Sequence, residues 1–258
     1  MKKIILFQIV FLFQFCIAQE NETVTYVNKK GEEVKEKKAV FLIQKLKLNN
    51  KLWEFNTYEI FGPMLTSIQT KDETGSIKNG VYISYTTGII DTIGYFKNNQ
   101  KDSTWRIFTH NVNNALVKEL EYKNDKLISE KDSTEINKQR DHFLDSIKAN
   151  KTSASVEIES SYISKDSGWS KFLIKNFRYP DRAINKEIQG KIIIEFIVNK
   201  EGKIENAIVE KSVEYSLDTE SLRIIHKSDG DWIAAVQNGR NVKSYKRQPF
   251  EFRLQIQK

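Results

Sequence analysis

The sequence contains very little cysteine, proline and histidine, and each shortage excludes a class of protein. The single cysteine, Cys16, permits neither a disulfide framework nor a zinc site built from several cysteines. The three prolines, at positions 63, 180 and 249, leave the chain without a proline-rich spacer. The three histidines, His110, His142 and His226, lie in separate segments. Their spacing is not that of metal ligands, so we expect no metal site.

The N-terminal apolar segment is too short for a bilayer span, which needs about 20 residues. It runs from Ile4 to Ile17 after two lysines, and the small residues Cys16 and Ala18 precede Gln19 at the spacing of a cleavage site. The pattern predicts a signal peptide over residues 1–18, cleaved after Ala18, and a periplasmic protein. Membrane contact would follow only if the segment were retained as an inner-membrane anchor or if Cys16 were lipidated.

Catalytic motifs and a basic stripe are also missing. The sequence has no G-x-S-x-G, P-loop or H-E-x-x-H pattern. The formal charge is +7, and loss of Lys2 and Lys3 with the signal peptide leaves 39 basic residues (41 − 2) against 34 acidic ones, or +5. Because this excess is spread along the chain, it does not indicate nucleic-acid binding. We therefore expect a protein that is not an enzyme, has no cofactor and binds no nucleic acid.

The region from Tyr26 to about Ser129 is rich in aromatic and β-branched residues interrupted by Gly and Asn, which predicts β-hairpins in series. The segment Gly80–Tyr85 recurs as Ser103–Phe108, 23 residues later (103 − 80). Such a period is typical of stacked units that bury their faces against their neighbours. The run Gly94–Trp105 is similar to the MORN-like repeats of the YwqK antitoxin-type family, which implies an all-β repeat domain over residues 19–130.

The aromatic residues of this repeat allow two interpretations. Tyr82, Tyr85, Trp105 and Phe108 could form an exposed platform that stacks on a glycan or a peptide. Alternatively, they form the core shared by neighbouring hairpins, which fixed repeat positions favour.

Residues 131–165 are polar, with much Ser, Lys, Glu and Asp, and are predicted to form a linker. Trp169, Phe172, Leu173 and Phe177 then recur at the spacing of an amphipathic helix. This helix would open a C-terminal domain over residues 166–258, which we expect to fold on its own.

The C-terminal region combines helix and strand signals. Pro180 is suited to the first position of a helix. Alternation from Ile192 to Val198, a loop over 199–202 and a return from Ile204 predict a hairpin, and Ser216 could cap a further helix. Pro249 lies in the last alternating run and predicts an edge strand. The expected fold is α+β, a three-stranded antiparallel sheet with two or three helices.

The order of these signals resembles the C-terminal domain of TonB-type energy transducers. The resemblance covers about a third of the chain and implies a structural role for each matching residue. These are Tyr179, Pro180, Gly190, Gly202, Leu217, Asp218, Trp232, Asn238, Gly239 and Pro249.

The resemblance also implies a partner in a Gram-negative envelope. The TonB family is thought to capture the N-terminal box of an outer-membrane receptor by β-strand addition. In this chain the pairing residues would be Lys243, Ser244, Tyr245, Lys246, Arg247 and Gln248. The alternative is that the charges of this strand only prevent aggregation.

Two functions remain open at this stage. The protein could support TonB-dependent transport across the outer membrane, as a transducer or as an accessory to one. It could instead be an envelope adaptor that uses both modules for protein–protein interaction without energy coupling. The missing proline-rich spacer and the short apolar segment count against a full transducer.

Overall fold

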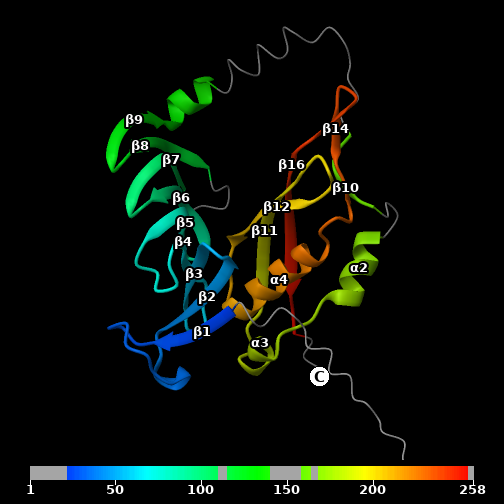
Figure 1. Ribbon diagram of the computed structural model, residues 1–258. Helices are drawn as coiled ribbons and strands as arrows, with labels where there is room; N and C mark the ends of the chain where they lie inside the picture. The colour runs from blue at the N-terminus through cyan, green and yellow to red at the C-terminus, as the bar shows by residue number, and fades with distance from the viewer. Residues whose placement is uncertain (1–21, 110–114, 140–157, 164–167, 255–258) are drawn as a thin grey trace, which may run out of the picture.

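The computed structural model describes residues 22–109, 115–139, 158–163 and 168–254 (Figure 1). The predicted signal peptide, Cys16, His110 and His142 lie outside these residues. Within the described ranges, no helix is both long enough and apolar enough to span a membrane.

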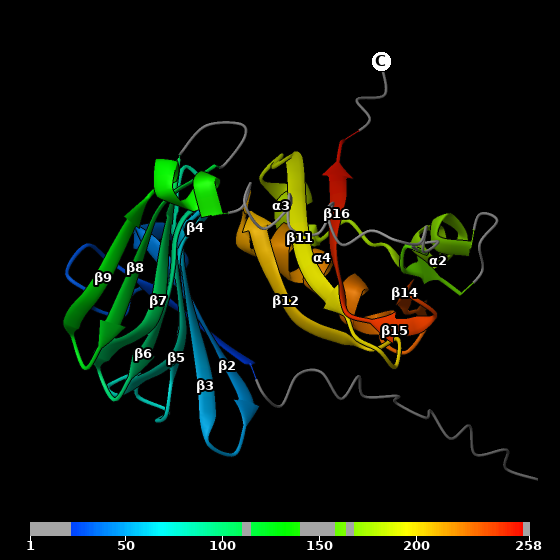
Figure 2. The same ribbon diagram turned by 90° about the horizontal axis from the view of Figure 1, so that it is seen from above.

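The N-terminal part is a curved antiparallel sheet in which each strand pairs with the next along the chain (Figures 1 and 2). One short 3-10 helix, η2 (Glu36–Lys38), interrupts the series between the first two strands. The strands are β1 (Glu22–Val27), β2 (Phe41–Asn49), β3 (Leu52–Glu59), β4 (Met64–Thr70), β5 (Lys78–Thr86), β6 (Ile89–Lys97), β7 (Gln100–Phe108), β8 (Leu116–Lys123) and β9 (Lys126–Asp132).

Two tight turns, one between β6 and β7 and one between β8 and β9, each accept a side-chain hydrogen bond from the strand that precedes their hairpin. Asn98 and Asn99 connect β6 to β7 with φ of 50° and 69°, the signature of a two-residue type I′ turn. The Asn99 side chain accepts a 2.7 Å hydrogen bond from the Lys78 N–H. Asp125 accepts one from the Lys101 N–H at 2.6 Å in the same way. Lys78 and Lys101 are 23 residues apart (101 − 78), so the period seen in the sequence is also the period of these turn contacts.

The repeat aromatics pack together on the sheet. The Trp105 side chain is only 5% exposed. Its ring stacks on Tyr82 at 5.5 Å and meets Phe96 and Tyr122 edge-on at 5.1 and 6.1 Å. Tyr85 lies in the main core instead. Aromatic pairs of this kind contribute about 0.5–1.5 kcal/mol beyond their burial. These contacts favour the interpretation as a shared core over that of an exposed platform.

Within residues 158–163 and 168–254, the C-terminal part contains three α-helices and a second group of strands. The strands β12, β11 and β16 form an antiparallel unit in that order, and α4 packs on β11 and β12 (Figure 2). The elements are β10 (Ser161–Tyr162), α2 (Gly168–Asn176), α3 (Asp181–Asn185), β11 (Gly190–Val198), β12 (Ile204–Lys211), α4 (Tyr215–Lys227), β13 (Trp232–Ile233), β14 (Ala235–Gln237), β15 (Arg240–Val242) and β16 (Ser244–Phe252).

Two helix starts differ from the expectation. Pro180 is the N-cap of α3, with extended ψ of 138°, so the helix begins one residue later. The cap of α4 is Glu214 and not Ser216, because Ser216 already lies inside the first turn. The Glu214 carboxylate accepts hydrogen bonds from both the N–H and the hydroxyl of Ser216, at 2.7 and 2.6 Å. A carboxylate at this end of a helix also interacts favourably with the helix dipole.

The two parts share one sheet and one hydrophobic core. Lys211 at the end of β12 pairs with Ile89 at the start of β6, which makes the sheet continuous. The same apolar cluster contains Leu42 and Tyr58 from the hairpins and Phe196 and Leu217 from the C-terminal part. A fragment that begins at residue 166 would therefore expose apolar surface that the full chain buries.

The end of the predicted linker is attached to the C-terminal part. Ile158 forms a β-bridge with Val236, and β10 pairs with β13. Residues 133–139 are helical.

Candidate partner-binding surface

The strand β16 lies at the end of the sheet order. All nine of its residues pair with β11, and no strand in the described ranges pairs with its other edge. Pro249 stands opposite Ile193 in this ladder. Proline has no N–H, so it is tolerated at strand positions where the N–H would point away from the neighbouring strand, here β11. Backbone groups alternate in direction along an antiparallel strand, so the N–H groups of Tyr245 and Arg247 are expected to point to the open edge too.

The side chains of the predicted pairing segment mostly have partners within the chain. Lys243 forms an ion pair with Glu205 at 2.5 Å, Lys246 one with Glu159 at 3.4 Å, and Arg247 one with Glu210. Ser244 bonds to Ser160 at 2.6 Å, and Gln248 donates to the Pro249 carbonyl at 2.8 Å. Tyr245 differs, because 72% of it is exposed. These contacts leave the backbone edge of β16 as the feature available for strand pairing.

Several family-motif residues fix turns and helix positions around this sheet. The Tyr179 hydroxyl donates to the Ile188 carbonyl at 2.7 Å, which closes the loop around α3. Gly202, in the loop between β11 and β12, has φ of +78°, and a Cβ there would lie 2.0 Å from the Trp232 carbonyl oxygen. Both the dihedral angle and this close approach require glycine. Gly190 opens β11 directly against the Val213 side chain.

Trp232 packs its ring against Phe196 and Trp169, with ring centroids 5.3 and 5.4 Å away. Its indole N–H donates to the Ser228 hydroxyl at 3.0 Å. The loop Asn238-Gly239 has φ of 51° and 72° and joins β14 to β15 as a type I′ turn. These residues support the sheet and do not lie on its open edge.

Asp218 connects α4 to the hairpin sheet. Its carboxylate is fully buried and accepts hydrogen bonds from the Ser212 hydroxyl at 2.5 Å and from the Val213 N–H at 3.1 Å. The Ser212 oxygen in turn accepts the N–H of Met64 in β4 at 2.7 Å. Burial, and to a smaller extent the charge of Glu214, raises the pKa of Asp218 to about 8 against the opposing effect of these hydrogen bonds.

Gly88 completes this junction from the turn between β5 and β6. Its carbonyl accepts the N–H of Ser212 at 2.8 Å. With φ of +78°, and with the Ser212 carbonyl oxygen 2.4 Å from where a Cβ would be, this position accommodates only glycine without movement.

Arg182 forms a second connection between the two parts. From α3 its guanidinium pairs with the fully buried Glu214 carboxylate at 2.6 Å, with Glu36 of η2, and with the Ile60 carbonyl. The guanidinium also lies 5.0 Å from the Phe61 ring centroid. The planar guanidinium has several N–H donors, so it can bind these three acceptors at once. The sequence offered no signal for this cluster, because its members come from four distant segments.

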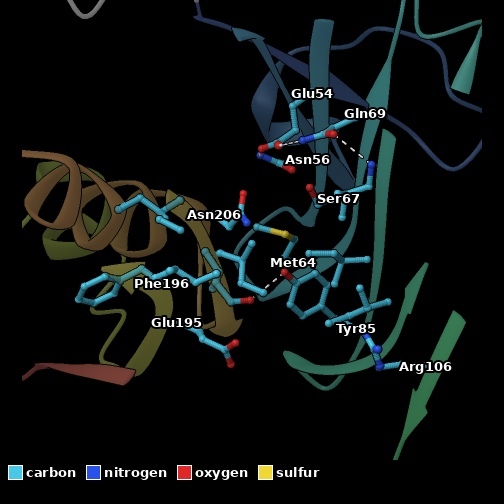
Figure 3. A pocket seen from close by; sticks show the side chains of 18 of the residues that line it. Glu54, Asn56, Met64, Ser67, Gln69, Tyr85, Arg106, Glu195, Phe196 and Asn206 are labelled. Atoms are coloured by element: carbon cyan, nitrogen blue, oxygen red, sulfur yellow. Dashed lines mark hydrogen bonds between the residues drawn. The ribbon is translucent and has the colours of Figure 1, made fainter. Parts of the chain in front are cut away.

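A cleft of about 400 Å³ lies between the hairpin sheet and β12 (Figure 3). Its polar end includes Glu54, Asn56, Ser67 and Gln69, and its apolar wall includes Tyr85. Burial raises the pKa of Glu54, against hydrogen bonds from the amides of Asn56 and Gln69 that lower it. This cleft was not anticipated, since both of its walls must be folded before it exists.

No group of three or more His, Cys, Asp and Glu side chains in the described ranges is placed to hold a metal ion. His226 lies in the last turn of α4 and is exposed.

The described residues form a β-rich protein with a C-terminal α+β unit whose last strand, β16, has one open edge. Residues 175–254 match the family model of the Gram-negative bacterial TonB protein C-terminal domain. The family match thus covers the unit that carries β16 and supports a TonB C-terminal domain there. Comparisons with curated proteins and with solved structures gave no significant match.

Proposed function

We propose that this protein binds an extended segment of a partner along the outer edge of β16, in support of TonB-dependent transport across the outer membrane. The observation that carries the proposal is the open edge of β16 within the region that matches the TonB C-terminal family. An added strand would form backbone hydrogen bonds at this edge. The expected partner is an outer-membrane receptor, reached from the periplasm.

The second candidate function is that of an envelope adaptor without energy coupling. It is supported by the shared core, because the hairpin sheet and the C-terminal unit would move as one body and could present two surfaces together. The expectation that the chain is not an enzyme fits both candidates.

The test uses a proline at the open edge. Arg247→Pro removes the N–H that is expected to point outward, while Arg247→Ala removes the same side chain and its pair with Glu210 but keeps the N–H. We would measure the affinity of both variants for a synthetic TonB-box peptide by calorimetry. Loss of one backbone hydrogen bond that leaves a carbonyl unpaired costs about 1–3 kcal/mol, so Arg247→Pro should bind about 5- to 150-fold more weakly than Arg247→Ala.

Thermal unfolding of both variants checks that the sheet remains intact. Equal affinities of two well-folded variants would contradict pairing at β16. A wild-type protein that binds no receptor peptide, but does capture another envelope protein, would favour the adaptor.

A further inference from the structure

Asn56, a residue that lines the cleft, has a buried side-chain hydrogen-bond acceptor without a partner in the described part of the chain. Asn56 is 2% exposed, and its side-chain Oδ1 has no hydrogen-bond partner among the described residues. A buried amide oxygen left alone costs free energy, so its retention calls for an explanation such as a ligand.

The orientation of this amide follows from its neighbours. The Glu22 carboxylate accepts from the Gln44 Nε2 at 2.8 Å, which directs the Gln44 Oε1 toward Asn56. The Asn56 Nδ2 donates to that oxygen at 3.0 Å and to the Glu54 Oε1 at 3.1 Å. A flipped amide would place oxygen against two acceptors, so the free atom must be the oxygen.

Glu54 adds a carboxylate next to this oxygen. Its hydrogen-bond donors are amides, from Asn56 and, at 3.5 Å, from Gln69. The cleft lining includes one cation, Arg106, and that side chain is paired with Glu119 at 2.9 Å. Figure 3 places Arg106 well away from Glu54 and Asn56. The polar end therefore presents acceptors and negative charge, which suits a cationic donor.

The opposite wall is a strand edge. β12 runs from Ile204 to Lys211 but pairs with β6 only through Lys211 and Ile89. The Tyr85 hydroxyl donates to the Val209 carbonyl at 2.8 Å, so at least one β12 carbonyl points into the cleft. Asn206 of β12 has φ of +52° and faces the polar end across the cleft (Figure 3). A strand edge beside apolar side chains can pair with an extended peptide.

We propose that this cleft is a second binding site, which takes an extended peptide segment of a partner protein and places a lysine or arginine side chain against Glu54 and Asn56. The ammonium or guanidinium group donates to the Glu54 carboxylate and to the Asn56 Oδ1. The aliphatic stem of that side chain lies along the apolar wall near Met64 and Ile83. The lining of this site includes Tyr245 of β16, but the proposed contacts are with Glu54 and Asn56 and do not use the outer backbone edge of β16.

The test compares two blocked pentapeptides of alternating valine and threonine, one with a central lysine and one with norleucine in its place. Calorimetry with the full chain should give about 10- to 100-fold tighter binding for the lysine peptide, the effect expected of hydrogen bonds to a charged group. Glu54→Gln should remove this preference. Glu73→Gln is the control, because Glu73 is an exposed carboxylate of a neighbouring hairpin that pairs with Lys45 and does not line the cleft.

A second measurement locates the lysine. Carbodiimide joins a carboxylate to an amine without a spacer, so at low peptide concentration it favours pairs that are held together in the complex. Mass spectrometry should then find the peptide attached at Glu54. Equal affinity for both peptides, an unchanged preference in Glu54→Gln, or coupling only at exposed carboxylates such as Glu73 would overturn the proposal. Arg247→Pro should leave lysine-peptide binding unchanged, which separates this site from the β16 edge.

Discussion

The buried carboxyl of Asp218 should make the stability of the protein fall as pH rises. With a pKa of about 8 in the folded state against an ordinary value of 3.8, the folded protein holds a proton that the unfolded chain releases between these values. The contribution of the neutral acid is thus fully present below about pH 4 and is lost as pH rises toward 8.

The magnitude follows from the size of the shift. Between about pH 4 and pH 7 the folded protein holds one more proton than the unfolded chain. Its free energy of unfolding therefore falls by about 1.4 kcal/mol for each of about 3 pH units, or by about 4 kcal/mol in total. Since small proteins have only about 5–15 kcal/mol of stability, this single group should dominate the pH profile in that range.

The variant Asp218→Asn isolates the effect. Its amide oxygen can accept the Val213 N–H, and its NH₂ can donate to the Ser212 oxygen, so it imitates the neutral acid. Urea unfolding followed by tryptophan fluorescence should show a flatter profile for this variant and a higher stability than wild type near pH 7. Asp218→Ala should instead be destabilised at every pH, because it leaves the buried Ser212 hydroxyl and the half-buried Val213 N–H without their partner.

Glu73→Gln, at an exposed carboxylate, serves as the control and should keep the wild-type profile. If wild type and Asp218→Asn lose stability in parallel between about pH 4 and pH 7, Asp218 is ionised in the folded protein and the reasoning fails.

Two further predictions concern the junction and the repeat core. Arg182→Met leaves the fully buried Glu214 carboxylate without its cation and should lower the free energy of unfolding by about 3–5 kcal/mol. Adding Glu214→Gln to this variant should recover much of the lost stability. A loss under about 1 kcal/mol for Arg182→Met in denaturant unfolding would contradict this role. Trp105→Ala removes a buried ring from the repeat aromatics and should cost about 3–5 kcal/mol in the same assay. Trp53→Ala, at a less buried tryptophan under Lys45 and Lys47, should lose less stability than Trp105→Ala. An equal loss in the two variants would contradict a core role for the Trp105 ring.

Local patterns anticipated the elements of the C-terminal unit. The alternation from Ile192 to Val198 lies within β11, and Pro249 lies in a strand at the edge of the sheet. These features depend on neighbouring residues, so periodicity and turn chemistry suffice to indicate them. The repeat spacing likewise anticipated that Tyr82 and Trp105 would pack together. Partner binding by β16, the cleaved signal peptide and the domain boundaries stay predictions.

The junction and the cleft could not be predicted in this way. Met64 and Ser212 are 148 residues apart, and Arg182 and Glu36 are 146 apart. Glu54 and Asn56 are alternate polar residues of a strand, which by itself indicates nothing unusual. They line a cleft only because β12 lies opposite them, and no local pattern in the sequence predicts that placement. Only the three-dimensional arrangement reveals which polar residues are buried together.

The distance along the chain between the junction partners also sets an order of assembly. Each β-hairpin closes through contacts between neighbouring strands, so the hairpin sheet can form while only the first half of the chain is present. The bond between Met64 and Ser212 must wait until β12 exists. Until β12 is made, Met64 of β4 and Tyr85 of β5 stay exposed to solvent. During synthesis from the N-terminus, the chain therefore exposes this apolar surface until its last third has been made.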